Sequence, residues 1–159
     1  MRESGFDPSN RFGALNVDII HYAPVCLNTL LYVMEDDAAR IMETLGDRPA
    51  ASAWASRAAS RRDLINRLMW DEQAGLYYDY NIRTRRLRRY DFATTFYPLW
   101  AGIASPAQAA RVRANLSGSK PPAAADEHGG HRQPVGRAVW LGAAADDCRR
   151  RPAALRLRR

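Results

Sequence analysis

The segment Pro24–Gly46, PVCLNTLLYVMEDDAARIMETLG, decides the fold. Its apolar side chains recur at spacings of three and four residues, and this period predicts one long amphipathic helix. The stripe consists of Leu27, Leu30, Leu31, Met34, Ala38, Ile41, Met42 and Leu45. Gly46 stands where a glycine in the left-handed conformation commonly ends a helix. We therefore expect a helix from about Pro24 to Leu45.

A second helix is predicted directly after this one. Asp47 is a preferred capping residue, and Pro49 suits the first turn because that position needs no N–H donor. The helical period then continues to about Trp70, through Trp54, Ala58, Arg61, Ile65, Leu68 and Met69. Because a loop of about three residues joins the two helices, they are expected to form an antiparallel αα-hairpin.

Three further segments follow the hairpin. Aromatic and polar residues alternate from Gly75, which predicts a short β-hairpin or an irregular excursion up to Tyr90. Residues 93–103 predict a helix that is apolar on most sides and is kinked or broken at Pro98. Ser105–Gln108, SPAQ, is a helix start, and this fourth helix is expected to reach Leu116.

This succession of elements predicts an all-α fold. Four helices with one fully apolar member do not close a compact bundle, so we expect part of a larger α/α array. Residues 1–22 are polar, and Gly5, Pro8 and Gly13 predict irregular structure there. No stretch approaches the roughly 18 apolar residues of a membrane span, so no membrane partner is expected.

The basic charge raises a nucleic-acid alternative. The 159-residue chain carries a net charge of +7, and a small module could bind nucleic acid through Arg85–Arg89 and Arg149–Arg159. Residues 118–159 hold 9 of the Lys and Arg residues against 4 of the acids, whereas residues 1–117 hold 15 against 13. Because most of the excess lies in the tail, we expect no nucleic-acid partner.

The cysteines indicate neither a metal site nor a disulfide framework. Cys26 and Cys148 lie in segments of different character, and their spacing matches no metal-binding pattern. Cys26 is expected to be a small buried apolar side chain. No metal and no cofactor are predicted.

One carboxylate near the start of the chain has the surroundings of a general acid. In Arg2–Phe12, RESGFDPSNRF, Asp7 lies between two phenylalanines and close to Gly5. A general acid needs a carboxyl partly withdrawn from water, so that its pKa rises toward the working pH. Gly5 would let a sugar approach the backbone closely. An Asp-Pro dipeptide in a loop is usually a plain turn, so these residues alone favour a turn over a catalytic acid.

This segment resembles the Glu/Ala-Ser-Gly-Trp-Asp-x-Ser-x-Arg-Trp motif of the α,α-trehalases, glycoside hydrolase family 37. In that motif the aspartate is the general acid. The resemblance therefore makes Asp7 the catalytic acid and places Gly5, Phe6 and Arg11 in the substrate site.

Three more segments resemble family elements in the same order. Pro24–Tyr32 is similar to Pro-Val-Asp-Leu-Asn-Ala-Leu-Leu-Tyr, residues 70–80 to Trp-Asp…Gly-Leu-Tyr-x-Asp-Tyr, and Phe96–Ala104 to Phe-Pro-Leu-Trp-Ala-Gly-Ile-Ala. Two residues depart from these patterns: Phe6 replaces a tryptophan, and Cys26 replaces an aspartate.

The resemblance implies a fold and a reaction. Residues 1–117 would be part of an (α/α)6 barrel that hydrolyses α,α-trehalose to two glucose molecules with inversion. Inversion needs a second carboxylate about 6.5–9.5 Å from the acid. That base, a glutamate in the family's C-terminal part, has no counterpart here, so the chain alone is expected to be inactive. Another inverting (α/α)6-barrel glycosidase is the nearest alternative. The compartment, cytoplasmic or periplasmic, and the oligomeric state stay open.

The tail, residues 118–159, has an unusual composition. It is rich in Arg, Ala and Pro without a period, which predicts disorder. The stretch Gln133–Asp146 has a back-translation that reads NQWDAPFGWAPLQ one base later, and this string resembles the family's next motif. We therefore expect the tail to be a frame-shifted, non-native reading of trehalase coding sequence.

The remaining acids are expected to be structural. Asp71 and Glu72 should end a helix and start a turn, and Asp79 should hold the excursion together by hydrogen bonds. Asp18 is expected to be a solvated loop acid, and His21 a satisfied histidine rather than a catalyst.

Overall fold

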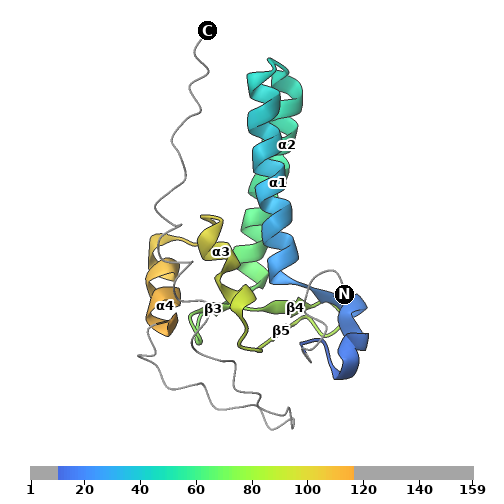
Figure 1. The fold of residues 1–159 in the computed structure, drawn as a ribbon, viewed down its shortest axis with the longest axis vertical. Coiled ribbons are helices and arrows are strands. Elements are labelled where there is room, and N and C mark those ends of the chain that lie inside the picture. Colours follow the sequence, from blue (N-terminus) through green and yellow to red (C-terminus); the bar gives the residue numbers. More distant parts are fainter. Residues whose placement is uncertain (1–10, 117–159) are drawn as a thin grey trace. The chain divides into compact units, whose positions relative to one another are not determined.

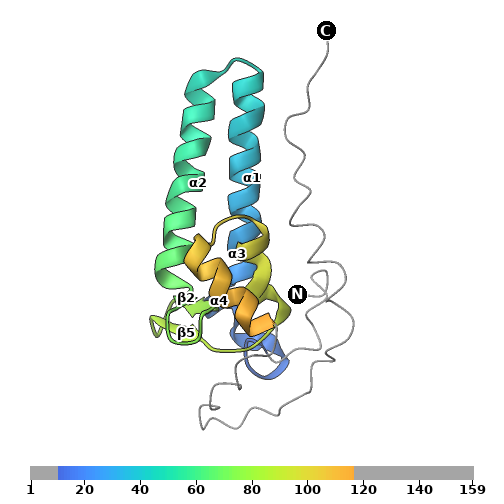
Figure 2. The same ribbon diagram turned by 90° about the vertical axis from the view of Figure 1, so that its left-hand side faces the viewer.

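The computed structural model describes residues 11–116 of the chain. Two long helices dominate this part: α1 (Val25–Thr44) and α2 (Arg48–Leu68) lie side by side and antiparallel (Figures 1 and 2). Gly46 follows the end of α1 and has a φ of 84°. The Asp47 side chain caps α2 by accepting from the Ala50 N–H at 3.0 Å. The predicted αα-hairpin and both of its end signals are confirmed.

Within residues 11–116, five short strands form two small antiparallel sheets beside the hairpin. Strands β2 (Trp70–Asp71) and β3 (Leu76–Tyr77) form one pair. The other sheet has the order β1-β4-β5, with β1 at Tyr22–Ala23, β4 at Asp79–Asn81 and β5 at Arg86–Arg88. The predicted β-hairpin is β4–β5, and its first strand also pairs with the residues that precede α1.

A helix stands where irregular structure was predicted before α1. The segment η2 (Ala14–His21) is a 3-10 helix, so the prediction for residues 1–22 was wrong over this part. Local hydrogen bonds stabilise this segment without an apolar period. The Asn16 N–H donates to the Gly13 carbonyl at 3.0 Å, and the Asn16 side-chain oxygen accepts from the Phe12 N–H at 3.0 Å. Such short-range polar bonds give hydropathy analysis no signal.

The predicted helix over residues 93–103 is shorter and divided. A 3-10 turn, η3 (Ala93–Phe96), leads into a single α-helical turn, α3 (Tyr97–Trp100), with Pro98 at its start. Gly102 then has a φ of 71°, which a side chain would disfavour. The break predicted from Pro98 is therefore present, and the helix ends earlier than expected.

The last described helix, α4 (Pro106–Leu116), begins as predicted. The Ser105 hydroxyl accepts from the Gln108 N–H at 3.3 Å, while the Gln108 side chain accepts from the Ser105 N–H at 2.9 Å. These reciprocal bonds are a capping box.

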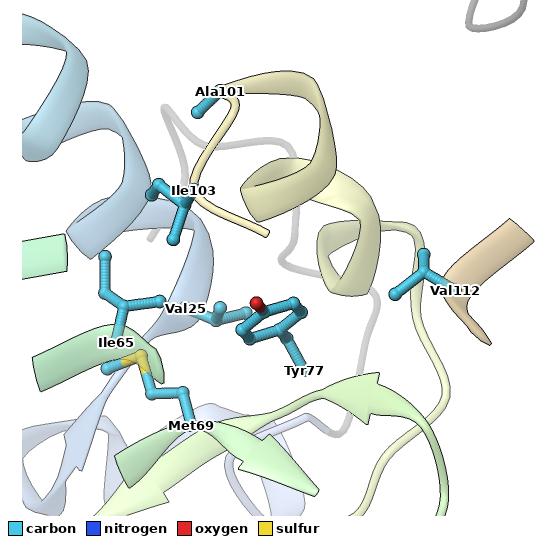
Figure 3. Packing of buried hydrophobic residues seen from close by; sticks show 7 residues of the cluster. All are labelled: Val25, Ile65, Met69, Tyr77, Ala101, Ile103 and Val112. Atoms are coloured by element: carbon cyan, nitrogen blue, oxygen red, sulfur yellow. The ribbon is translucent and has the colours of Figure 1, made fainter. Parts of the chain in front are cut away.

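The apolar core lies at the end of the hairpin opposite its loop, and Figure 3 shows its side chains. There the start of α1 and the end of α2 pack against strand β3, against helix α4 and against the segment that follows α3. The core consists of Val25, Ile65, Met69, Tyr77, Ala101, Ile103 and Val112. None of the helices in residues 11–116 combines the length and the apolar composition of a membrane-spanning segment.

Candidate functional site

The described residues begin at the edge of the predicted site. Asp7, Gly5 and Phe6 lie outside them, as does the tail with its predicted frame shift. Arg11 is described, and it is only 1% exposed. Its surroundings therefore show what the structure places next to the motif.

The Arg11 guanidinium forms a bidentate ion pair with Asp79. Its Nε donates to Asp79 Oδ2 at 2.5 Å, and its Nη2 donates to Asp79 Oδ1. The backbone N–H of Val25, at the start of α1, donates to the same Oδ1 at 2.8 Å. Asp79 is 3% exposed, so its carboxylate is buried between the motif and the first turn of α1.

Cys26 also lies against the guanidinium. Its Sγ lies 3.4 Å from Arg11 Nη1, within hydrogen-bonding reach, and the thiol is buried as predicted. The residue that departs from the family pattern therefore contacts the motif arginine. A thiol thus faces this guanidinium at the position where the family pattern has a carboxylate.

The environment keeps Arg11 charged. Burial acts to lower the pKa of Arg11, but the hydrogen bonds and charge of Asp79, with a smaller contribution from Cys26, outweigh burial and raise it. The guanidinium also lies 5.0 Å from the ring centre of Phe12 and 5.9 Å from that of Phe92. Cation–π contact adds to this stabilisation.

The cluster joins segments that are far apart in the sequence. Arg88 Nε, from β5, donates to the Arg11 carbonyl at 3.1 Å. The end of the motif is thus held by β4, by β5 and by the start of α1. The contact of Arg11 with substrate that the resemblance implies stays a prediction.

Asp71 has the structural role predicted for it. Its Oδ1 accepts from the N–H groups of Gln73 and Ala74, at 2.9 and 3.0 Å, and its Oδ2 accepts from Arg89 Nε at 2.6 Å. Burial acts to raise the pKa of Asp71, but these bonds and the Arg89 charge outweigh it, so that the pKa is lowered. The carboxylate therefore stays ionised and fixes the turn between β2 and β3.

Sequence reasoning missed a second ion pair, in which only the glutamate is fully buried. Glu35 of α1 accepts from Arg61 Nε and Nη2 of α2, both at 2.8 Å, and Arg61 also donates to Asn28 at 3.1 Å. Arg61 lies on the apolar period of α2, and this was the one available signal. The pair joins the two helices of the hairpin.

Among residues 11–116, no three His, Cys, Asp or Glu side chains group as metal ligands would. Asp18 is exposed, as predicted, and His21 is half-buried.

The sequence model of the trehalase family matches residues 1–138. This chain belongs to the trehalase family. The resemblance seen in four motifs is thereby confirmed, and the match covers the segment that contains Asp7.

Relatives and a solved structure agree with this membership. The cytosolic neutral trehalase of Neurospora crassa is 38% identical over 131 residues, and that of Pyricularia oryzae is 39% identical over 128. The alignments cover 70% and 69% of this chain and 17% of each relative. The neutral trehalase Nth1 structure from Saccharomyces cerevisiae matches with a TM-score of 0.63 and 34% identity, over 70% of this chain and 22% of that one.

This structural match confirms the predicted fold class. The described residues are mostly helical, with the predicted short β excursion, and they correspond to part of a trehalase. The chain spans about a sixth of the length of the curated relatives it matches.

Proposed function

We propose that this chain is part of a glycosidase that hydrolyses α,α-trehalose to two glucose molecules, with Asp7 as the general acid. The observation that carries the proposal is the trehalase family match over residues 1–138, which includes the Asp7 motif. The relatives named as neutral trehalases support the same substrate.

The proposed reaction inverts the anomeric centre. Asp7, held protonated by a partly dehydrated site, gives its proton to the glycosidic oxygen as the bond to the sugar breaks. Gly5 lets the sugar approach the backbone, and Phe6 supplies an apolar wall. A second carboxylate, about 6.5–9.5 Å away, activates water on the opposite face of the ring.

The chain alone is proposed to be inactive, because the water-activating carboxylate belongs to a family segment with no counterpart in this sequence. Purified chain incubated with trehalose should release no glucose above a buffer blank. Steady release that Asp7→Asn abolishes would refute inactivity while supporting the acid role.

A chimera tests the acid role directly. Residues 1–116 of this chain would replace the matching segment of the Neurospora crassa relative, and glucose release from trehalose would be measured. Asp7→Asn should lower kcat by about 10²–10⁴, the range that a general acid contributes. Asp18→Asn is the matched control, because Asp18 is an exposed aspartate in the same part of the chain.

Two outcomes would count against this proposal. Equal losses from Asp7→Asn and Asp18→Asn would remove Asp7 from the acid role. An active chimera that cleaves other disaccharides and leaves trehalose intact would favour another inverting glycosidase of the same fold.

A further inference from the structure

The apolar side chains on the outer side of α1 follow a seven-residue repeat. They alternate at spacings of four and three residues: Leu27, Leu31, Met34, Ala38, Ile41 and Leu45. This alternation is the pattern of the d and a positions of a coiled coil, which form a seam that packs against a further helix. We call these six residues the α1 seam.

The α1 seam is open over most of its length. Leu27, Met34 and Ile41 are 51%, 54% and 55% exposed, and Leu45 is 72% exposed. From its first to its last residue the seam is about 27 Å long, which corresponds to a helix of about five turns. A helix with such an apolar face is stable in a fold only when another element covers that face.

The two edges of the seam differ. On one edge, Asn28 and Glu35 bind Arg61 of α2, so α2 already occupies that edge. The other edge carries Leu30, which is 47% exposed, and Asp37, which is exposed. A partner helix can therefore reach the seam only from the Leu30–Asp37 edge.

A second copy of α1 fits this geometry poorly. An antiparallel pairing centred on the seam has its midpoint at Asp36 and brings the Asp37 side chains of the two copies together. Like charges placed opposite each other are unfavourable at an interface. A parallel pairing sets the Leu30–Asp37 edge of each copy against the Asn28–Glu35 edge of the other, where α2 lies. Both pairings of two copies are thus disfavoured.

The comparison with a solved trehalase points to a different partner. The chain corresponds to 22% of the Saccharomyces cerevisiae structure, with a TM-score of 0.63, and to 17% of the Neurospora crassa relative. The remainder of a trehalase is therefore several times longer than this chain. That remainder is the source of covering helices that the family fold itself provides.

We propose that the α1 seam binds one long amphipathic helix from the part of a trehalase fold that this chain does not contain. The partner helix lies nearly parallel or antiparallel to α1, at the crossing angle of about 20° that heptad packing produces. Its own apolar residues recur at spacings of three and four. This inference concerns packing, and it does not depend on Asp7 being the general acid.

Two methionines report on the seam. Met34 lies in the α1 seam and is 54% exposed, whereas Met69 lies in the apolar core and is 4% exposed. Hydrogen peroxide oxidises accessible methionine to the sulfoxide, and mass spectrometry of proteolytic peptides gives a rate for each residue. Met69 is the matched control, because it has the same chemistry and is already buried.

The experiment compares the full chain at low concentration with the chimera that carries residues 1–116 in the Neurospora crassa relative. In the full chain, Met34 should be oxidised about tenfold faster than Met69, or more. In the chimera, Met34 should be oxidised about tenfold more slowly than in the full chain, while Met69 stays slow. The same exchange into the Pyricularia oryzae relative is made in parallel, so that the result does not depend on the folding of one host.

Three results would overturn this assignment of the partner. The first is a Met34 that is oxidised as fast in the chimeras as in the full chain while Met69 stays slow. The second is a Met34 that is already as slow as Met69 in the full chain. The third is protection in the chimeras that disappears on dilution, which would assign the seam to a second copy.

These measurements are separate from the test of the acid role. Because oxidation is followed without substrate, a chimera can protect Met34 whatever Asp7→Asn does to glucose release. Protection of Met34 together with equal losses from Asp7→Asn and Asp18→Asn would refute the acid role and leave the packing of the seam in place.

Discussion

The two ends of the α1–α2 hairpin differ in what they bury. At the end opposite the loop, Val25, Ile65 and Met69 pack into the apolar core (Figure 3). Along the rest of α1 the predicted apolar stripe faces outward: Leu27, Leu30, Met34, Ile41 and Leu45 are 47–72% exposed. The residues that α1 does bury include polar ones, Thr29 and Glu35.

This contrast shows that an apolar period identifies a helix without identifying its neighbour. The side of α1 toward α2 carries the Glu35–Arg61 pair, while the apolar stripe has no cover among residues 11–116. Exposed apolar surface of this kind promotes association. In the segment Phe96–Ile103, Pro98 and Ile103 are buried whereas Trp100 is 50% exposed, so most of the exposed apolar surface named here belongs to α1.

The largest expected effect contrasts two isoleucines. Ile65→Ala, in the core, should lower the free energy of unfolding by about 2–5 kcal/mol, because it removes packed apolar volume. Ile41→Ala, on the exposed stripe of α1, should change it by less than about 0.5 kcal/mol. Urea denaturation followed by circular dichroism measures both values. Equal losses would mean that the stripe is covered in solution.

An intermediate effect concerns pH and Asp71. Since its pKa is lower in the folded chain than in the unfolded one, Asp71 contributes stability above its unfolded value of about 3.9, and this contribution is lost as the pH falls through the folded value. Asp71→Asn should cost about 1–3 kcal/mol at neutral pH, and this difference should shrink on acidification. Thermal unfolding from pH 7 to pH 3 tests it, and a constant difference would contradict it.

A double substitution on the exposed stripe of α1 should change the unfolding free energy least and should clearly reduce association of the chain with itself. Met34→Gln combined with Ile41→Gln, both on the exposed stripe, should change the unfolding free energy by no more than about 0.5 kcal/mol per site. It should also reduce concentration-dependent association measured by sedimentation velocity. Ala59→Gln, at an exposed position of α2, is the control and should leave association unchanged. If the double variant associates as much as the parent, the exposed stripe of α1 is not the surface through which the chains associate.

The parts of the fold predicted from sequence are those with local causes. Asp47, Gly46 and the Ser105–Gln108 pair act within one helical turn, so their spacing alone locates helix ends. The pairing of Arg11 with Asp79 joins residues 68 positions apart and depends on the whole fold. No period or spacing predicts that contact, although Asp79 was expected to have a structural role.

For the candidate site, the sequence predicts only the residues that belong to its motif. The family resemblance named Asp7, Gly5, Phe6 and Arg11, but it could not show that Cys26, noted as a departure, lies against the motif arginine. That contact depends on how the first turn of α1 meets the preceding loop, and no local rule fixes such an angle. The Glu35–Arg61 pair was missed for the same reason.

The pairing of β1 with β4 has a consequence for how the hairpin can vary. Tyr22 and Ala23 lie opposite Asn81 and Tyr80. The chain between these strands, which includes both helices, is therefore a long loop closed by the β1–β4 pairing. The entropy of closing such a loop grows only with the logarithm of its length, by about 0.6 kcal/mol per doubling. Extra helical turns inserted at the Gly46 end would therefore lengthen the hairpin while leaving the β1–β4 pairing at its base in place.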